Sequence, residues 1–217
     1  MGTASSTRGE SRSNVAGFTL VEVIVVLSVV LLLTGIAVPM LSGYMEDGRR
    51  ARAESECKTL AAAVMSFYKD VGTYPSRSST GADNYLYVLL TGTTKPTSNP
   101  FTAGHSWITW GMDATRGDVL DNHLLEDAPG GQTSAAYATT GSLRWRGPYT
   151  AGPAPLDPWG RPYVINIISG WRNHATNHKR VFVLSAGPDG RLQTNYRARS
   201  TDDIAGDDIG LMLLQKP

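Results

Sequence analysis

The last quarter of the chain carries residues well suited to binding a metal. Five aspartates fall between positions 189 and 208: Asp189, Asp202, Asp203, Asp207 and Asp208. The first lies in a Pro-Asp-Gly turn, which sets a carboxylate beside bare carbonyls, and the last two can fold back onto it. Calcium prefers about six to eight hard oxygen ligands of this kind. The residues alone allow a calcium site or, as the simpler interpretation, a solvated acidic loop.

A second unusual residue is Glu22, a carboxylate at the edge of a long apolar run. The 23 residues from Val23 to Met45 carry no charge, and most are Val, Leu, Ile, Ala or Met. A charged side chain inside a membrane segment costs about 2.5–3.5 kcal/mol and commonly marks a functional position. A removable signal peptide or a plain anchor does not need such a residue. Glu22 therefore indicates a further role for this segment.

The sequence lacks the motifs of common enzymes. It contains no Gly-x-Ser-x-Gly, no His-Glu-x-x-His and no Gly-x-x-x-x-Gly-Lys. His174 and His178 have helical spacing but lie in a polar connector, which favours a loop over a zinc site. The net charge of +1 argues against nucleic-acid binding, and the one cysteine, Cys57, excludes an intrachain disulfide. We expect no enzyme, with a membrane-tethered hydrolase as the alternative.

The apolar run is long enough to cross a membrane. At about 1.5 Å per residue it spans about 34 Å as a helix, against a hydrocarbon layer of about 30 Å. Arg8 and Arg12 precede it, and positive residues ahead of an apolar segment favour a cytoplasmic N-terminus. The residues after about Tyr44 are then exported. A signal peptide cleaved after Gly35-Ile36-Ala37, a plain anchor and a buried soluble helix are the alternatives.

The helix is expected to continue past the apolar run as an amphipathic half, residues 44–71. Gly72 and Pro75 supply a stop signal, and Pro39 is expected to bend or loosen the helix because it removes a backbone hydrogen bond. Apolar residues recur at spacings of three and four, which places them on one face: Cys57, Leu60, Val64, Phe67 and Val71. Cys57 is therefore interpreted as a core residue.

Strand patterns are clear only in the last third of the chain. Residues 163–168 and 180–184 are β-branched and aromatic runs that are expected to pair antiparallel, and residues 209–214 form a third candidate. In the variable middle, residues 76–145, the run 85–90 fits a helix or a strand, and 118–125 fits a helical turn. The expected fold class is α+β, with a long N-terminal helix packed on a small antiparallel sheet.

The start of the chain resembles the class III signal of type IV pilins and pseudopilins. The matching residues are Gly17-Phe18-Thr19-Leu20-Val21-Glu22, followed by the apolar run with Pro39. The resemblance implies that a prepilin peptidase removes residues 1–17 by cleaving after Gly17 and methylates the new terminus at Phe18. The transmembrane half, residues 18–43, then stays in the protein. The resemblance also implies that the terminal ammonium of Phe18 in a neighbouring subunit neutralises Glu22 during assembly. Val15-Ala16 depart from the family, which often has a basic residue just before the glycine.

Two later motifs are similar to a narrower group, the major (G-type) pseudopilins of type II secretion systems. They are Asp157-Pro158-Trp159-Gly160-Arg161-Pro162-Tyr163, preceded by Gly147-Pro148-Tyr149, and Ser185-Ala186-Gly187-Pro188-Asp189-Gly190, followed by Asp207-Asp208-Ile209-Gly210. The resemblance implies a structural Ca²⁺ ion. Its implied ligands are the carboxylates of Asp189, Asp207 and Asp208 and the carbonyls of Ala186 and Arg191, with Asp202 and Asp203 as an alternative acidic pair.

The resemblance implies a structural subunit that polymerises into a type II secretion pseudopilus and drives protein export across the outer membrane. A subunit of a surface type IV pilus for adhesion or motility is the alternative. The implied partners are copies of the chain in a helical homopolymer, minor pseudopilins, the prepilin peptidase and the inner-membrane assembly platform. The chain would cross the inner membrane once. Its N-terminus would be cytoplasmic, and its periplasmic head, residues 44–217, would hold the β-region and Asp-rich loop at 146–214.

Overall fold

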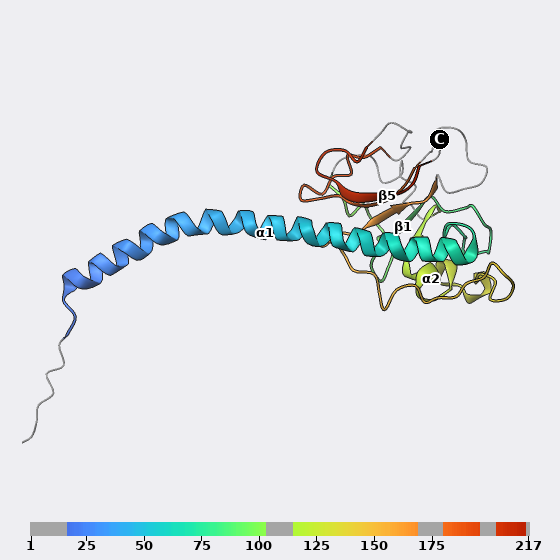
Figure 1. Ribbon diagram of the computed structural model, residues 1–217, viewed down its shortest axis with the longest axis horizontal. Coiled ribbons are helices and arrows are strands. Elements are labelled where there is room, and N and C mark those ends of the chain that lie inside the picture. The colour runs from blue at the N-terminus through green and yellow to red at the C-terminus, as the bar shows by residue number, and fades with distance from the viewer. Residues whose placement is uncertain (1–16, 103–114, 169–179, 196–202, 216–217) are drawn as a thin grey trace, which may run out of the picture. The chain divides into compact units, whose positions relative to one another are not determined.

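The computed structural model describes residues 17–102, 115–168, 180–195 and 203–215. It divides the chain into two compact units, residues 1–45 and residues 46–217, and the second unit is called the head below. Helix α1, Leu20–Val71, contributes to both units (Figure 1). It begins slightly later than the predicted Phe18 and ends at the predicted Val71.

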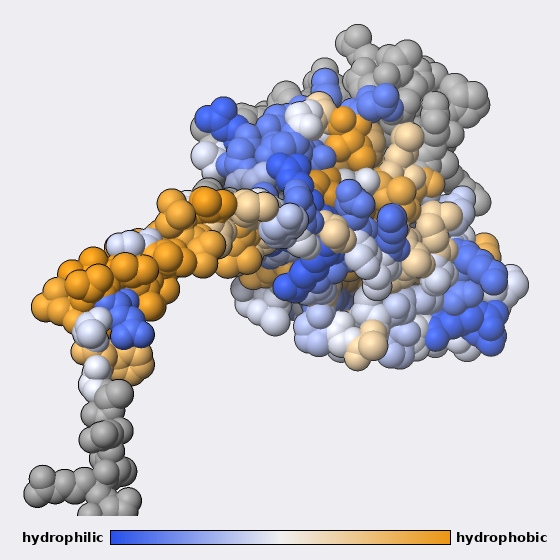
Figure 2. Space-filling model, turned by 60° about the vertical axis from the view of Figure 1, so that its left-hand side comes forward, coloured by the Kyte–Doolittle hydropathy of each residue, from blue (hydrophilic) through white to orange (hydrophobic). Residues whose placement is uncertain are grey.

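In the N-terminal unit, the described residues from Leu20 onward form a helical segment with an apolar surface. Its large hydrophobic side chains are exposed, with Leu31 at 72% and Leu32 at 67%, and they form the orange surface at the helical end in Figure 2. Among the described residues, α1 is the one helix long and apolar enough to cross a membrane. The helix runs through Pro39 without interruption, and the predicted bend there stays a prediction.

In the head, α1 buries the face that its spacing predicts. Cys57, Leu60, Val64 and Phe67 are buried, and Val71 is partly buried against the same cluster. These side chains pack on residues of the sheet and of the connecting segments, including the fully buried ring of Tyr163. The helix end is marked by Gly72, whose positive φ of 79° suits a residue without a side chain.

The described residues of the head form a five-stranded sheet in the order β2-β1-β3-β4-β5. The three strands predicted from the sequence are present as neighbours and pair antiparallel, β3 with β4 and β4 with β5. A register shift interrupts the second pairing between Val181 and Phe182. The strands are β1 Val88–Leu90, β2 Gly117–Val119, β3 Val164–Asn166, β4 Arg180–Ser185 and β5 Ile209–Gln215. The α+β fold class is confirmed.

The variable middle adds two strands, of which the first was one of two alternatives in the sequence analysis and the second was not predicted. The run 85–90 contains strand β1, so the helical alternative for it is wrong, and β2 pairs with β1 in parallel. The predicted helical turn is present as α2, Asp121–Leu124. Two short 3₁₀ turns follow, η1 Pro129–Gly131 and η2 Thr133–Ala135. Strands of three residues carry too little alternation to be recognised in a sequence.

Alternate residues of the central strands face two separate cores. Ile165, Val181 and Val183 belong to the cluster that contains the α1 residues. Val164, Phe182 and Leu184 belong to a second cluster on the opposite face, where loop side chains such as Phe101 and Leu192 cover the sheet. Successive strand residues point to opposite faces of the sheet, and both faces are buried here. The sequences of these strands are therefore continuously apolar instead of alternating between apolar and polar residues.

Candidate functional site

The predicted processing site lies just before the first turn of α1. Gly17 and Phe18 are both exposed, and Phe18 keeps 82% of its surface accessible. No other part of the described structure comes within 4 Å of the position that a side chain at Gly17 would occupy. The bond between the two residues is therefore open to a protease on this side of the helix.

Glu22 lies in the first turn of α1 and has a structural relation that the sequence analysis missed. Thr19 precedes the helix, and its hydroxyl accepts a hydrogen bond from the backbone N–H of Glu22 at 3.2 Å. A threonine cap followed three residues later by glutamate is the capping-box pattern, in which both residues satisfy free N–H groups of the helix start. Glu22 can thus serve helix initiation as well as the assembly role that the resemblance implies.

The heptad Asp157–Tyr163 forms a tight turn organised by one buried carboxylate. Asp157 accepts hydrogen bonds from the N–H groups of Trp159 at 3.1 Å and Arg161 at 2.8 Å, and from the Ser185 hydroxyl at 2.7 Å. Gly160 completes the turn at a positive φ of 82°, where a residue with a side chain is strained. The turn is thereby fixed to the end of β4.

Other heptad side chains fix the turn to helix α1. The Trp159 indole N–H donates to Glu46 at 3.4 Å, and the Tyr163 hydroxyl donates to Glu56 at 2.6 Å. Burial, together with the hydrogen bond to Glu56, raises the pKa of Tyr163 well above its ordinary value. Because the donors and acceptors come from segments far apart in the chain, the heptad holds the helix, the sheet and the C-terminal segment in one arrangement.

The triplet Gly147-Pro148-Tyr149, which precedes the heptad in the sequence, lies against the end of α1. The Tyr149 hydroxyl donates to Asp70 at 3.2 Å and accepts from the N–H of Arg146 at 2.9 Å. Its ring makes an edge contact with Phe67 at a centroid distance of 5.5 Å. The heptad and this triplet therefore both hold helix α1 to the rest of the head.

The segments 186–195 and 203–208, called the Asp-rich loop below, bring two of the predicted ligands together. The Gln193 amide N–H₂ donates to Asp189 at 2.9 Å and to Asp207 at 2.7 Å. The backbone N–H of Asp189 also donates to Asp207, at 3.2 Å. Gly187, at a positive φ of 62°, packs on the Asp207 carbonyl so closely that a side chain does not fit. A polar amide thus bridges the two carboxylates.

Asp208 is buried and bound to another residue of the same loop. One of its carboxylate oxygens accepts from the N–H of Thr194 at 2.7 Å and from its hydroxyl at 2.6 Å. The other carboxylate oxygen, like Gln193 Oε1, is buried without a hydrogen-bond partner in the described part of the chain. Burial raises the pKa of Asp208 to about 6 because the charged form loses hydration.

The remaining predicted calcium ligands are Ala186, Arg191 and the alternative pair Asp202 and Asp203. Ala186 is buried, Arg191 is exposed and donates its N–H to Asp189 at 2.7 Å, and Asp203 is exposed. Asp202 lies outside the described residues. Within the described ranges, no three His, Cys, Asp or Glu side chains are grouped so that they could hold a metal ion. The calcium ligands therefore stay a prediction.

Arg161 connects the heptad to the Asp-rich loop. Its guanidinium donates to the Gly187 carbonyl at 2.9 Å and packs against Gly190, where a side chain would displace the guanidinium. The loop is therefore attached to the rest of the head through the same heptad that contacts α1. Two motifs that the sequence analysis treated separately form one connected structure.

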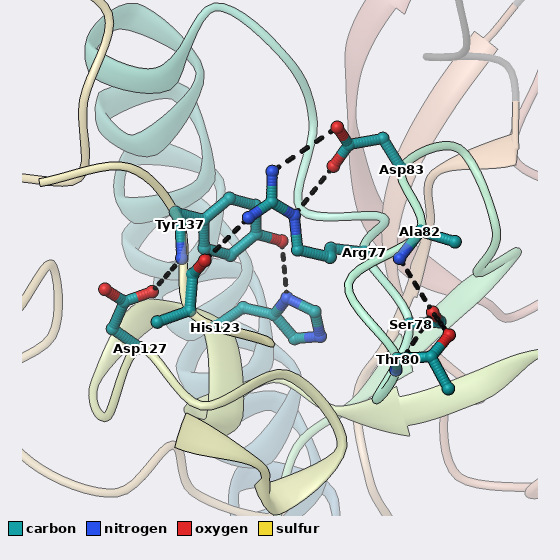
Figure 3. A network of polar contacts seen from close by, with 9 residues as sticks. Arg77, Ser78, Thr80, Ala82, Asp83, His123, Asp127 and Tyr137 are labelled. Atoms are coloured by element: carbon teal, nitrogen blue, oxygen red, sulfur yellow. Dashed lines mark hydrogen bonds and ion pairs between the residues drawn. The ribbon is translucent and has the colours of Figure 1, made fainter. Parts of the chain in front are cut away.

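A buried polar network in the middle of the head was not predicted. His123, fully buried, bonds through Nε2 to Asp118 at 2.9 Å and through Nδ1 to the Tyr137 hydroxyl at 2.7 Å. Figure 3 shows the Tyr137 ring beneath the Arg77 guanidinium, with its hydroxyl directed at His123. Burial alone would raise the pKa of Asp118, but its hydrogen bonds from His123 and two backbone N–H groups hold it below its ordinary value. Both ring nitrogens of His123 have partners, which indicates a structural role. His105, His174 and His178 lie outside the described residues.

Comparison with known proteins gives one match in the N-terminal segment and one in the second half of the chain. Residues 12–38 match the family of the prokaryotic N-terminal methylation motif, and residues 130–203 match the family of type II secretion system protein G. The type II secretion system core protein G of Pectobacterium carotovorum subsp. carotovorum is 32% identical over 189 residues, which cover 87% of this chain and 86% of that protein. The chain belongs to the protein G family of type II secretion systems. No solved structure matches it.

Membership of the protein G family confirms the resemblance found in the sequence. It supports the predicted role of this G-type pseudopilin as a structural subunit of the secretion pseudopilus, and it does not favour the surface-pilus alternative. The methylation-motif match spans Gly17, Phe18 and Glu22 together with the apolar half of α1. The match at 130–203 includes the heptad and part of the Asp-rich loop.

Proposed function

We propose that this G-type pseudopilin is held in the inner membrane by the apolar half of α1, with its N-terminus cytoplasmic and its head periplasmic. Prepilin peptidase removes residues 1–17 and methylates Phe18, and the mature chain polymerises with the help of minor pseudopilins and the assembly platform. The observation that carries the proposal is one continuous helix that is apolar and exposed in its first half and packed on the sheet in its second. Such a helix supplies both a membrane segment and part of the core of a folded head.

The proposed processing predicts the mass of the mature chain. We expect membrane-extracted protein to lack residues 1–17 and to carry one added methyl group at Phe18, because the bond after Gly17 is exposed and precedes the first helical turn. Intact-mass spectrometry measures both changes. An N-terminus at Val38, which a signal peptidase would produce, contradicts the proposal, and so does a full-length chain in cells that contain prepilin peptidase.

The two roles open to Glu22 can be separated by two variants. Glu22→Gln keeps a side chain suited to a capping box but removes the charge, whereas Thr19→Ala removes the cap and keeps the charge. We expect Glu22→Gln to insert in the membrane and to form few or no fibres, because a neutral side chain cannot attract the terminal amine of a neighbouring subunit. Electron microscopy of sheared fibres and immunoblots of the membrane fraction measure the two outcomes.

Thr19→Ala serves as the matched control for helix initiation. Loss of a cap costs about 1 kcal/mol at the helix end, which a membrane-embedded helix can tolerate. We therefore expect near wild-type fibre yield from this variant. Normal fibres from Glu22→Gln together with few fibres from Thr19→Ala would assign Glu22 to capping and reject its assembly role.

We also propose that the Asp-rich loop holds a structural calcium ion. The donor chemistry supports this, because the loop contains four aspartates and the amide of Gln193, and two of its buried oxygens, on Asp208 and Gln193, lack hydrogen-bond partners within the described structure. Hard oxygen donors of this type suit Ca²⁺. The ion would draw on Asp189, Asp207 and Asp208 and would supply between these carboxylates the positive charge that the neutral amide of Gln193 does not.

A further inference from the structure

Helix α1 carries a regular stripe of alternating charge at the start of the head. Glu46, Arg50, Glu54 and Lys58 follow each other at intervals of four residues, so they lie along one side of the helix. Their charges alternate strictly in sign. These residues are called the charged stripe below.

Within the described residues, ion pairs involve the stripe only at its N-terminal end, where Glu46 and Arg50 lie. Arg50 lies 3.8 Å from Glu46, beyond hydrogen-bond distance, and Glu46 Oε1 is buried without a hydrogen-bond partner among the described residues. Glu54 and Lys58 are exposed, and neither forms an ion pair within the described parts of the chain. By contrast, Arg52 and Glu56, also four residues apart, form an ion pair at 2.8 Å on the same helix. The spacing therefore permits internal pairing, but the second half of the stripe does not use it.

Three residues of the stripe lie at the edge of a hollow of about 410 Å³. Arg50, Glu54 and Lys58 line one side of it, and Gly206 and Asp207 line the other. The hollow keeps these side chains accessible from outside the head.

A stripe of this kind is complementary to itself only at certain offsets. If two parallel copies are shifted by four residues, Glu46 faces Arg50, Arg50 faces Glu54, and Glu54 faces Lys58 of the other copy. Without a shift, or with a shift of eight residues, each charge faces a like charge. Opposite charges at close range attract and like charges repel, so the stripe discriminates between these offsets.

We infer that the charged stripe is a contact between neighbouring copies in the fibre and that it sets their axial offset at four residues. The inference rests on the proposed function, because it requires parallel copies of the chain. The N-terminal pair requires the same offset, since the Phe18 amine and Glu22 are also four residues apart. Two separate sets of charges on one helix thus demand the same shift between neighbours.

The offset can be measured by crosslinking single-substitution variants of the full chain in assembled fibres. Glu54→Cys, Lys58→Cys and Ala62→Cys each replace an exposed residue of α1 with a thiol. The native Cys57 is 1% exposed and does not compete for a thiol reagent. Two variants with different epitope tags are co-expressed with an excess of the wild-type chain, so that most contacts in the fibre keep the full charged stripe, and the fibres are treated with a short bifunctional maleimide.

We expect Glu54→Cys co-expressed with Lys58→Cys to give a crosslinked dimer carrying both tags. Two differently tagged copies of Glu54→Cys test the zero offset, and Glu54→Cys with Ala62→Cys tests the offset of eight. Both control pairs should give far less dimer. Fibres in which either control pair links as well as the four-residue pair overturn the inference and leave the proposed function intact. Absence of fibres from the wild-type chain overturns both.

Charge reversal supplies a second readout. Glu54→Lys turns two of the three contacts repulsive, and Lys58→Glu turns one. We expect fibre yield to fall about tenfold for Glu54→Lys and by a smaller factor for Lys58→Glu, with both defects weaker at high salt. Asp47→Lys makes the same charge change on the same helix outside the stripe and should assemble normally. Equal yields from Glu54→Lys and Asp47→Lys would refute the inference, while an unchanged melting temperature of Glu54→Lys excludes misfolding as the cause of its defect.

Discussion

We expect a soluble fragment beginning at Gly43 to melt about 5 to 10 °C higher in excess calcium than in chelator. Residues 46–217 form a compact unit with its own core, so this fragment is a suitable sample. An ion that binds only the native state stabilises it by about 2.7 kcal/mol at a hundredfold excess over Kd. For a domain of this size, about 1 kcal/mol corresponds to roughly 2–4 °C in Tm. Differential scanning calorimetry measures the shift.

The variants of the loop make this prediction specific. Asp207→Ala and Asp208→Ala should remove the calcium-dependent shift, since both carboxylates belong to the proposed ligand set. Asp203→Ala, at an exposed position of the same loop, should keep most of it. Elemental analysis of the purified fragment checks for the ion directly. If the melting temperature does not change on chelation and no calcium is bound, the segment is a solvated acidic loop.

Asp157→Ala should lower the free energy of unfolding by about 3–5 kcal/mol. The carboxylate is 4% exposed and accepts hydrogen bonds from Trp159, Arg161 and Ser185. Each buried donor left without an acceptor costs about 1–3 kcal/mol. The loss includes the connection between the heptad and the end of β4, from which the Asp-rich loop continues. Urea unfolding of the same fragment, followed by circular dichroism, gives the value.

Asp157→Asn is the matched control for this substitution. The amide retains one oxygen for the N–H groups of Trp159 and Arg161, but it offers N–H₂ where Ser185 needs an acceptor. We expect a smaller loss, about 1–2 kcal/mol. If both variants unfold at the wild-type urea concentration, the heptad is not the structural connection that its hydrogen bonds indicate.

The elements predicted correctly are those whose burial leaves a repeating pattern. The apolar spacing from Cys57 to Val71 predicted the buried face of α1, and the runs at 163–168 and 180–184 predicted β3 and β4. The sequence left the run that contains β1 open between helix and strand, because a short apolar run fits both, and β2 was missed because it is only Gly-Asp-Val. Asp118 is buried in β2 since a histidine five residues later meets it, and no pattern within the strand predicts that contact.

The same distinction holds for the functional residues: those with a local sequence signature could be recognised, and those defined by distant partners could not. Glu22 was recognisable because a carboxylate beside an apolar run is anomalous, and its relation to Thr19 was readable from the three-residue spacing but was overlooked. The heptad was recognisable as a turn, whereas its partners Glu46, Glu56 and Ser185 come from distant segments. Likewise, Gln193 stands between Asp189 and Asp207 only once the loop has folded. Contacts between segments of irregular backbone have no signature in local sequence.

Because the thiol of Cys57 is buried, we expect the covalent structure of the head to be the same in reducing and in oxidising surroundings. Its sulfur lies 3.7 Å from the Ile209 carbonyl, and burial raises the pKa of the thiol to about 12. The reactive thiolate is therefore scarce at neutral pH, and oxidants have little access to it. The polypeptide keeps the same covalent structure in a reducing and in an oxidising compartment. Its maturation should thus proceed unchanged in cells that lack disulfide-forming enzymes.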